Sequence, residues 1–406
     1  MAVMALYQFE EVLKEKSGVR RLTLTDFRNY AHLRLETGIC PVVITGENGA
    51  GKTNILEALS FLTPGRGLRS AKISDMTRMR PALASTDYAL ANKNFAWAVS
   101  ADIIKNDEPY SLSTGLQKAQ REENDVWHSF DRRVVLIDGQ KASTQAELGK
   151  YLSAIWVTPQ MDRIFLGGPQ PRRSFLDRIV YMFDLEHAKR TATFEHLYKE
   201  WYRLLKEGVH DNVWLLNLED QMATVGVSIA AARRETVARL NTFIAAEGDD
   251  VFPDLRLELS GKVEQMLDDM AALDAEDAYR EMLYKSRRTV FENDSVEGVN
   301  RTDFKVYFKK KNMPAELCST GEQKSLLVSI ILAQTKCQIL DKGFAPVLLL
   351  DEVTTHLDAL KRDALLVKIR DLHLQAFMTS TSADIFKVLK NDAQFFEVKN
   401  NSIREI

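Results

Sequence analysis

Residues 46–53 have the composition and spacing of a phosphate-binding loop. They follow the apolar segment 41–45 and precede a helix that we expect over residues 54–62. Glycines let backbone N–H groups turn inward around phosphate oxygens, and a helix N-terminus attracts anions. Lys52 then faces the outer phosphates of a nucleotide, while the Thr53 hydroxyl binds Mg²⁺. The sequence therefore predicts that ATP contacts a continuous run of residues, Gly46, Glu47, Asn48, Gly49, Ala50, Gly51, Lys52, Thr53 and Asn54.

Two acidic residues follow a second apolar run. The segment 347–350 contains one valine and three leucines, and Asp351 and Glu352 come directly after it. This pattern is typical of a buried strand that delivers carboxylates to the phosphate end of a parallel sheet. We predict that Asp351 belongs to the Mg²⁺ shell and that Glu352 activates the attacking water. An apolar strand ending in two acids is weak evidence alone, but together with the phosphate loop it indicates nucleotide hydrolysis.

A third motif selects among the classes of phosphate-loop protein. Residues 318–324 read Cys-Ser-Thr-Gly-Glu-Gln-Lys and precede an apolar helix expected over residues 325–340. A serine at a helix N-terminus offers a hydroxyl and free N–H groups to an anion, although an ordinary helix cap has the same appearance. Because the motif lies shortly before Asp351, it resembles the signature sequence of the ABC ATPase superfamily. That resemblance implies that Ser319, Gly321 and Gln323 complete the ATP site of the opposite subunit.

Two further single residues match positions of the same superfamily. Gln160, after a short apolar run, resembles the Q-loop residue that contacts Mg²⁺ or the attacking water. Asp358, shortly after Glu352, resembles the aspartate of the D-loop, which crosses the dimer interface. The resemblance therefore implies a catalytic set of Glu352, Gln160 and Asp351 and a Mg²⁺ set of Thr53, Asp351 and Gln160.

The elements that must position these residues are visible as periodic patterns. Period-two alternation over residues 21–36 predicts a hairpin, and strands are expected at 95–102, 110–115, 134–137, 256–259, 304–308 and 376–379. Apolar residues at helical spacing dominate the region 171–247, where a polar interval at 206–212 predicts two antiparallel helices. We therefore expect an α/β fold, an ABC-ATPase head with a P-loop mixed sheet and helices, carrying a mainly helical insertion that forms a second lobe.

This layout divides the 406-residue chain into four parts. We predict a leader at residues 1–18, an N-terminal ATPase part at 19–170, a helical insertion at 171–290 and a C-terminal ATPase part at 291–406. The leader lacks the basic segment and cleavage site of a signal peptide.

Composition excludes several classes of protein. The chain is 45% hydrophobic and 27% charged, which is incompatible with wholesale disorder. No apolar run reaches the length of a membrane-spanning helix, and three cysteines without CxxC spacing favour a reducing compartment, so we predict a cytoplasmic protein without membrane association. The net charge of −3 means that any nucleic-acid binding depends on local basic patches. Of several arginine and lysine clusters, Arg66 and Arg69 are the best DNA-binding candidates, because they lie beside the expected ATP site.

Six segments together resemble the RecF family of bacterial recombination mediators, which are similar to the heads of SMC-type ATPases. They are residues 24–30, 46–54, 171–178, 300–303, 319–324 and 349–353, and their matches extend from about residue 20 to 385. The resemblance implies that ATP, with Mg²⁺, drives a homodimer to clamp double-stranded DNA or gapped DNA, and that weak, DNA-stimulated hydrolysis releases it. It also implies work with RecR and RecO in loading RecA at replication gaps, within DNA damage repair and the SOS response.

Two positions depart from these family patterns. Where many proteins of this class place a switch histidine after the last core strand, this chain has Met378-Thr379-Ser380-Thr381, so we expect a hydroxyl to take that role. The residues before Arg301 are Gly-Val-Asn where a Pro-His pair is expected, so no histidine is available there.

Three other functions share part of this pattern. The ATPase subunit of a membrane transporter would have a much shorter segment between Lys52 and Ser319. A P-loop kinase or GTPase has no need of the Ser319 motif, and a structural head that binds ATP without cleaving it has no need of Glu352. Membrane fractionation separates the transporter from the DNA-binding ATPase.

Overall fold

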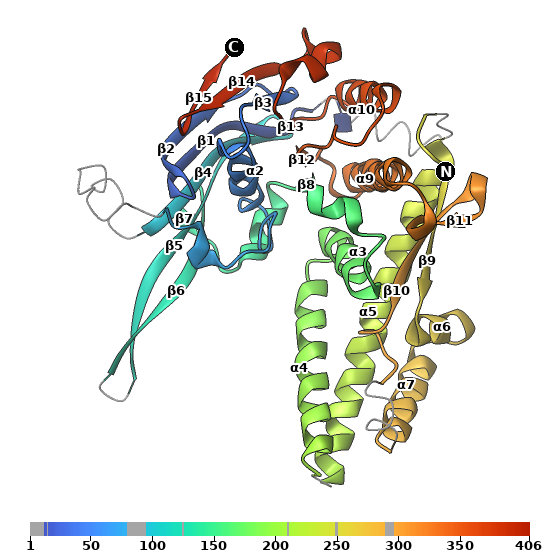
Figure 1. The fold of residues 1–406 in the computed structure, drawn as a ribbon. Coiled ribbons are helices and arrows are strands. Elements are labelled where there is room, and N and C mark those ends of the chain that lie inside the picture. Colours follow the sequence, from blue (N-terminus) through green and yellow to red (C-terminus); the bar gives the residue numbers. More distant parts are fainter. Residues whose placement is uncertain are drawn as a thin grey trace. The chain divides into compact units, whose positions relative to one another are not determined.

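The computed structural model describes residues 12–13, 15–78, 95–123, 126–208, 211–247, 251–288 and 296–406 (Figure 1). The chain forms two compact units, one of residues Met1–Met161 with Gln338–Ile406 and one of Asp162–Cys337. The second unit extends beyond the segment 171–290, the insertion expected from the sequence, at both ends. Most of the expected leader, residues 1–11 and 14, lies outside the described residues.

The first unit contains a six-stranded sheet whose strands are ordered β15-β14-β3-β13-β12-β8. All neighbouring strands are parallel except β14 and β15. The four consecutive strands β3, β13, β12 and β8 are wholly buried, as expected for parallel strands covered on both faces. The strand bounds are β3 Val42–Thr45, β8 Ala154–Val157, β12 Val347–Leu350, β13 Ala376–Ser380, β14 Gln394–Lys399 and β15 Ser402–Glu405.

An antiparallel sheet in the same unit confirms the hairpin predicted over residues 21–36. Its order is β2-β1-β4-β5-β6-β7, with β1 Gly18–Phe27, β2 Tyr30–Glu36, β4 Phe95–Lys105, β5 Glu108–Glu123, β6 Val126–Ile137 and β7 Gln140–Lys141. Helix α2 (Lys52–Ser60) contacts β1 of this sheet and β12 and β13 of the parallel sheet. Phe27, Phe61 and Trp97 meet edge to face at centroid distances of 5.5–6.1 Å and form part of the buried core beside α2.

The second unit is built around a pair of long antiparallel helices, α4 (His187–Lys206) and α5 (Asn212–Glu247), which lie side by side (Figure 1). The sequence predicted this pair. Its core joins apolar residues of both helices, such as Trp201 and Met222, to Tyr279 of α7 (Ala272–Ser286). Helices α6 (Lys262–Asp269) and α7 were not predicted, because their apolar positions are few and separated by acidic residues.

The remaining elements of the second unit frame the signature segment. Strands β9 (Leu255–Ser260), β10 (Asp303–Phe308) and β11 (Met313–Pro314) form a three-stranded antiparallel sheet. Helix α3 (Pro169–Phe183) contacts β10, and helix α9 (Thr320–Lys342) begins directly after Ser319. The predicted helix at 325–340 therefore starts five residues earlier and includes most of the signature motif.

Candidate nucleotide-binding site

The phosphate loop joins β3 to α2 through backbone conformations that favour glycine. Gly46 and Gly51 have φ angles of 149° and 107°. A Cβ atom on Gly46 would lie 2.5 Å from the Val398 carbonyl oxygen, and one on Gly51 would lie 2.4 Å from the Asn29 amide nitrogen. Side chains at these two positions would therefore be both strained and crowded. The loop ends at the N-terminus of α2, where free N–H groups attract an anion.

Lys52 is buried at the mouth of this loop. Its ammonium donates to the carbonyl oxygens of Gly46 at 2.7 Å and Glu47 at 2.9 Å, which draws the loop around the lysine. Desolvation lowers the pKa of Lys52, while the nearby carboxylates of Glu352 and Asp351 act in the opposite direction. The lysine thus supplies a cation in a partly dehydrated site, where its attraction for phosphate is stronger than in water.

Two of the expected Mg²⁺ ligands, Thr53 of the phosphate loop and Asp351 after β12, are in contact. The Thr53 hydroxyl donates to Oδ1 of Asp351 at 2.9 Å, although the residues are far apart in the sequence. A hydroxyl beside a carboxylate offers the hard oxygen ligands that Mg²⁺ prefers. No group of three or more His, Cys, Asp or Glu side chains suited to a metal is found within the described ranges. The donor set therefore fits a Mg²⁺ ion that takes its other ligands from phosphate and water, as that ion usually does.

The parallel sheet explains why these residues gather. Strands β8 and β12 pair in register, with Val157 opposite Leu350, and the N–H of Asp351 donates to the Val157 carbonyl at 2.9 Å. The carboxyl ends of β3, β8 and β12 therefore share one edge. That edge carries the phosphate loop, Asp351 and the segment leading to Gln160, which is exposed.

Asp358, the predicted D-loop residue, has a local structural role. It is the N-cap of α10 (Ala359–Asp371), and its carboxylate accepts from the Lys361 N–H at 2.9 Å. This backbone hydrogen bond lowers the pKa of Asp358. The neighbouring Leu360 is 71% exposed, so this end of the unit presents an apolar side chain beside the capping carboxylate.

Asn29 belongs to the site although no motif in the sequence predicted a role for it. Its amide donates to Oδ1 of Asn401 at 2.7 Å and to the Ala50 carbonyl at 3.4 Å, and it accepts from the Asn54 amide at 2.7 Å. Asn29 therefore connects the tip of the first hairpin to the phosphate loop and to the C-terminal hairpin. The segment 24–30 was a family-like motif, but nothing in its composition indicated contact with the loop.

The signature serine, in the second unit, takes part in a helix capping box. Ser319 is exposed, and both its N–H and its hydroxyl donate to Oε2 of Glu322 at 2.9 Å. Glu322 also pairs with Lys311, and these bonds, with that of Lys311 first, lower the pKa of Glu322 to about 2. The cap therefore remains ionised at every physiological pH and fixes the start of α9.

Two neighbouring signature residues point inward. Gln323 is 2% exposed and donates to the Cys318 carbonyl at 2.9 Å, so it fixes the backbone just before Ser319 from the buried side of the helix. Lys324 is 1% exposed and pairs with Asp162, which lies two residues after Gln160 in the sequence. Burial of an ion pair costs free energy unless the two charged groups stay in close contact. This pair therefore fixes α9 against the segment at residue 162.

The two arginines proposed for DNA binding differ in their surroundings. Arg66 is exposed, and no hydrogen bond or ion pair to it is found within the part of the chain that the structure describes. Arg69 donates to Asn54 at 3.0 Å and to the buried Glu57 at 3.2 Å, and Glu57 also accepts two bonds from Arg28. Arg69 is therefore partly occupied by bonds to side chains of the phosphate-loop helix, whereas the exposed Arg66 has no such bond among the described residues.

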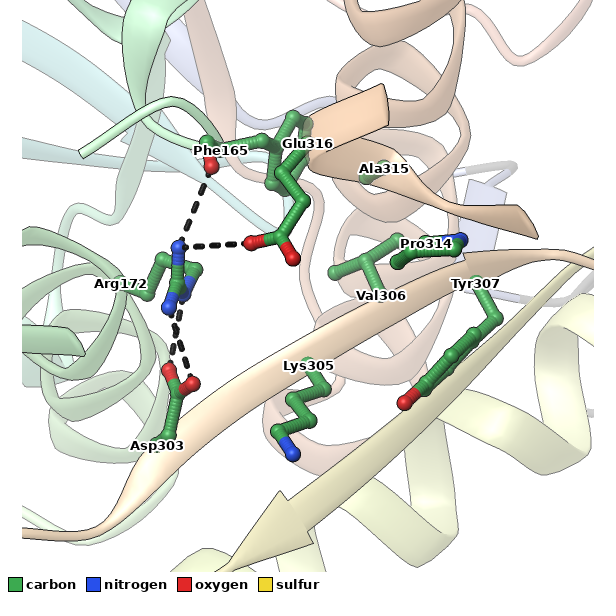
Figure 2. A pocket seen from close by; sticks show the side chains of 9 residues that line it. All are labelled: Phe165, Arg172, Asp303, Lys305, Val306, Tyr307, Pro314, Ala315 and Glu316. Atoms are coloured by element: carbon green, nitrogen blue, oxygen red, sulfur yellow. Dashed lines mark hydrogen bonds and ion pairs between the residues drawn. The ribbon is translucent and has the colours of Figure 1, made fainter. Parts of the chain in front are cut away.

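Another basic residue serves a structural purpose. Arg172 lines a small pocket of about 130 Å³, where it forms a two-bond pair with Asp303 at 2.8 Å and lies 3.7 Å from Glu316 (Figure 2). It also donates to the carbonyls of Phe165 and Gly167. The family-like segments 171–178 and 300–303 thus meet through this ion pair, which supports the segment before Ser319. With four partners, Arg172 is not available to bind DNA.

Comparison with known proteins identifies the family. The RecF/RecN/SMC N-terminal domain family model matches residues 18–404. The DNA replication and repair protein RecF of Rhizobium rhizogenes is 41% identical over 393 residues, covering 96% of this chain and 99% of the relative. Two solved structures of the recombination mediator protein RecF, described as RecF-ATPrS and RecF-ATP in the RecFOR pathway, match with TM-scores of 0.79 and 0.74. Each is 20% identical and covers 97% of this chain, and they are covered to 99% and 100%. These matches confirm the expected fold class, that of an SMC-like ATPase head. The chain belongs to the RecF family.

Proposed function

We propose that this protein is an ATP-dependent DNA-binding recombination mediator whose ATP site is completed by a second copy of the chain. The observation that carries the proposal is the meeting of two motifs, the phosphate loop and the acidic segment after β12, at one edge of the parallel sheet. The Thr53 hydroxyl is joined to the Asp351 carboxylate by a 2.9 Å hydrogen bond. Together with the loop that surrounds Lys52, these two groups form a site suited to a nucleoside triphosphate. A relative described as RecF-ATP supports ATP as the nucleotide.

In this proposal each residue at the sheet edge has a separate task. The N–H groups at the start of α2 and the Lys52 ammonium hold the outer phosphates. Thr53 and Asp351, with Gln160 from the neighbouring strand end, hold Mg²⁺, which neutralises charge on the phosphates. Glu352, half-buried beside Lys52, accepts a proton from the attacking water.

The signature segment supports a shared site. Ser319 is exposed at the start of a 23-residue helix, and Leu317 beside it is 70% exposed. A helix N-terminus with an exposed hydroxyl suits the γ-phosphate held by another subunit, and the exposed leucine suits burial in a dimer. Because ATP would contact both subunits, it would bind the dimer far more tightly than the monomer, so ATP would drive dimerisation by linkage.

The DNA partner follows from the family and from the exposed basic residues. Arg66 lies on the loop after the phosphate-loop helix, and buried Arg133 fixes that loop by donating to the Gly65 carbonyl at 2.6 Å. An exposed arginine on a loop held in this way, next to the proposed ATP site, would couple nucleotide binding to phosphate-backbone contact. The proposal places the protein at gapped DNA in the cytoplasm, where with RecR and RecO it helps to load RecA. Family membership favours this role over that of a transporter subunit, and no described helix is long and apolar enough to cross a membrane.

Sedimentation and duplex DNA binding, measured on one preparation with and without ATP and Mg²⁺, test the proposal. We expect ATP to convert a monomer into a dimer and to raise DNA affinity at least tenfold. Lys52→Ala is the matched control, since it removes the phosphate contact and should respond to ATP in neither assay. A wild-type protein that stays monomeric with saturating ATP, or that binds DNA equally in both states, would contradict the proposal.

A further inference from the structure

A buried threonine lies between the two acids of the proposed hydrolysis site. Thr379 is on β13, adjacent to β12, and only 1% of its surface is exposed. Its hydroxyl donates to Oδ1 of Asp351 at 2.7 Å and accepts from the backbone N–H of Glu352 at 3.0 Å. One side chain therefore contacts the carboxylate of the first acid and the backbone of the second.

The backbone of Glu352 needs such support. Its φ angle is +48°, in the left-handed region that non-glycine residues seldom adopt, and the turn continues with a hydrogen bond from the Thr355 N–H to the Glu352 carbonyl. Such a conformation persists only when the surroundings fix it, and it is concentrated at functional sites. The bond from the Glu352 N–H to Thr379 fixes the turn at the residue where the chain leaves β12.

The same hydroxyl also fixes the orientation of Asp351. Oδ1 of this carboxylate accepts from both Thr53 and Thr379, so the two hydroxyls approach one oxygen from the phosphate-loop helix and from β13. In a buried site these bonds are stronger than in water, and they restrict the rotation of the carboxylate. Thr379 thus connects the Mg²⁺ ligand to the general base.

We propose that Thr379 is the positioning residue of the hydrolysis site: it sets the direction in which Glu352 leaves the strand and the rotamer of Asp351. This inference rests on the proposed ATPase function. Because its hydroxyl is buried and bonded to both acids, Thr379 acts through them and does not contact the nucleotide. The hydroxyl expected in place of a switch histidine is therefore a support within the protein.

The neighbouring hydroxyl provides a matched control. Ser380 is also buried, at 5% exposure, but the one hydrogen bond found for its hydroxyl among the described residues comes from the N–H of Ser382, two residues away, at 3.3 Å. Ser380→Ala removes a buried hydroxyl from the same strand without touching either acid. Thr379→Val keeps the shape of the side chain and removes both bonds, and Thr379→Ser keeps the hydroxyl.

Single-turnover ATP hydrolysis with excess protein, together with calorimetric ATP affinity, tests the inference. We expect Thr379→Val to slow hydrolysis between about tenfold and hundredfold, because small misplacements of a catalytic group have effects of this size. The Kd for ATP should change less than about threefold, because Lys52 and the loop remain. Thr379→Ser should recover most of the rate, and Ser380→Ala should match the wild type. Thermal unfolding of each variant shows that the fold is retained.

The outcomes distinguish a failure of the Thr379 positioning role from a failure of the proposed ATPase function. Hydrolysis by Thr379→Val at the wild-type rate would overturn the positioning role, and so would equal rates in Thr379→Val and Thr379→Ser. Glu352→Gln is measured in parallel. If that variant hydrolyses ATP as fast as the wild type, Glu352 is not the base, and the proposed function fails together with this inference.

Discussion

Two clusters of charged residues, one in each unit, are arranged differently. In the second unit Arg233, 2% exposed, is matched by carboxylates: it forms two bonds with Asp177 and lies 3.6 Å from Glu264. At the sheet edge of the first unit, Glu352 is half-buried on a left-handed backbone, and its carboxylate takes part in none of the hydrogen bonds found among the described residues. A saturated ion-pair network holds a fold together, whereas a constrained acid with unused bonding capacity is suited to chemistry.

The largest effect should come from breaking the saturated network. Arg233→Met removes a partner from the buried Glu264 and from the partly buried Asp177 and should lower the free energy of unfolding by about 3–5 kcal/mol, because the charge of the buried acid is left uncompensated. Thermal or urea unfolding measures this loss. Arg234→Met, whose side chain is 34% exposed and pairs with Asp268, is the control and should cost less than about 1 kcal/mol. An equal decrease in the free energy of unfolding for the two variants would show that the buried Arg233 network stabilises the fold no more than an exposed ion pair does.

At the sheet edge that carries Glu352, a substitution should change the rate of ATP hydrolysis and leave the free energy of unfolding nearly unchanged. Glu352→Gln should slow ATP hydrolysis about 10²–10⁴-fold, because an amide cannot accept a proton from water. ATP affinity should persist, since Lys52, Thr53 and Asp351 are unchanged, and the ATP-bound dimer should accumulate. Phosphate release and sedimentation with ATP measure the two effects. A variant with lower stability but normal hydrolysis would place Glu352 with the structural residues.

Sequence alone predicted the parts of this contrast that depend on local patterns. The phosphate loop, the apolar strand before Asp351 and the helical hairpin are encoded in consecutive residues with recognisable periods. The contacts of Asn29, Thr379 and Arg172 were not predicted, because each joins segments far apart in the chain. A hydroxyl in the segment 378–381 was expected to act, but only strand pairing shows which one reaches the acids. The inward position of Gln323 was also hidden, because the motif suggested a nucleotide ligand.

A smaller effect concerns the DNA contact. Arg66→Glu should weaken duplex binding by about tenfold and reduce the slope of log affinity against log salt by about one, because one phosphate contact is lost. Arg69→Glu should weaken it less, since Arg69 already pairs with Glu57. Fluorescence anisotropy over a range of salt concentrations measures both. An unchanged affinity and salt slope for Arg66→Glu would show that this loop does not meet DNA.

The smallest effect is on the charge that caps the signature helix. The Lys311 bond comes first among the causes that hold the pKa of Glu322 at about 2, below its ordinary value. Lys311→Ala should therefore raise this pKa, which NMR titration of the Glu322 side chain measures. Since the folded pKa is depressed, the stabilisation of the cap is present above the unfolded pKa and is lost as pH falls towards 2. An unchanged pKa in the variant would assign the shift to the Ser319 bonds alone.

In the proposed dimer the phosphate loop of one subunit works with the signature of the other, and mixing two inactive variants tests this pairing. Lys52→Ala destroys the loop and Ser319→Arg blocks the signature, so each variant alone should be inactive. In a heterodimer, the intact loop of Ser319→Arg faces the intact signature of Lys52→Ala, which restores one of the two sites. Because neither variant has a complete site by itself, ATP should join them only as heterodimers, and an equal mixture should recover up to about half of the wild-type ATPase rate, since each heterodimer has one intact site of two. No recovery, although mixed dimers are detected with ATP, would show that each nucleotide site lies within a single subunit and that the signature of the partner takes no part in hydrolysis.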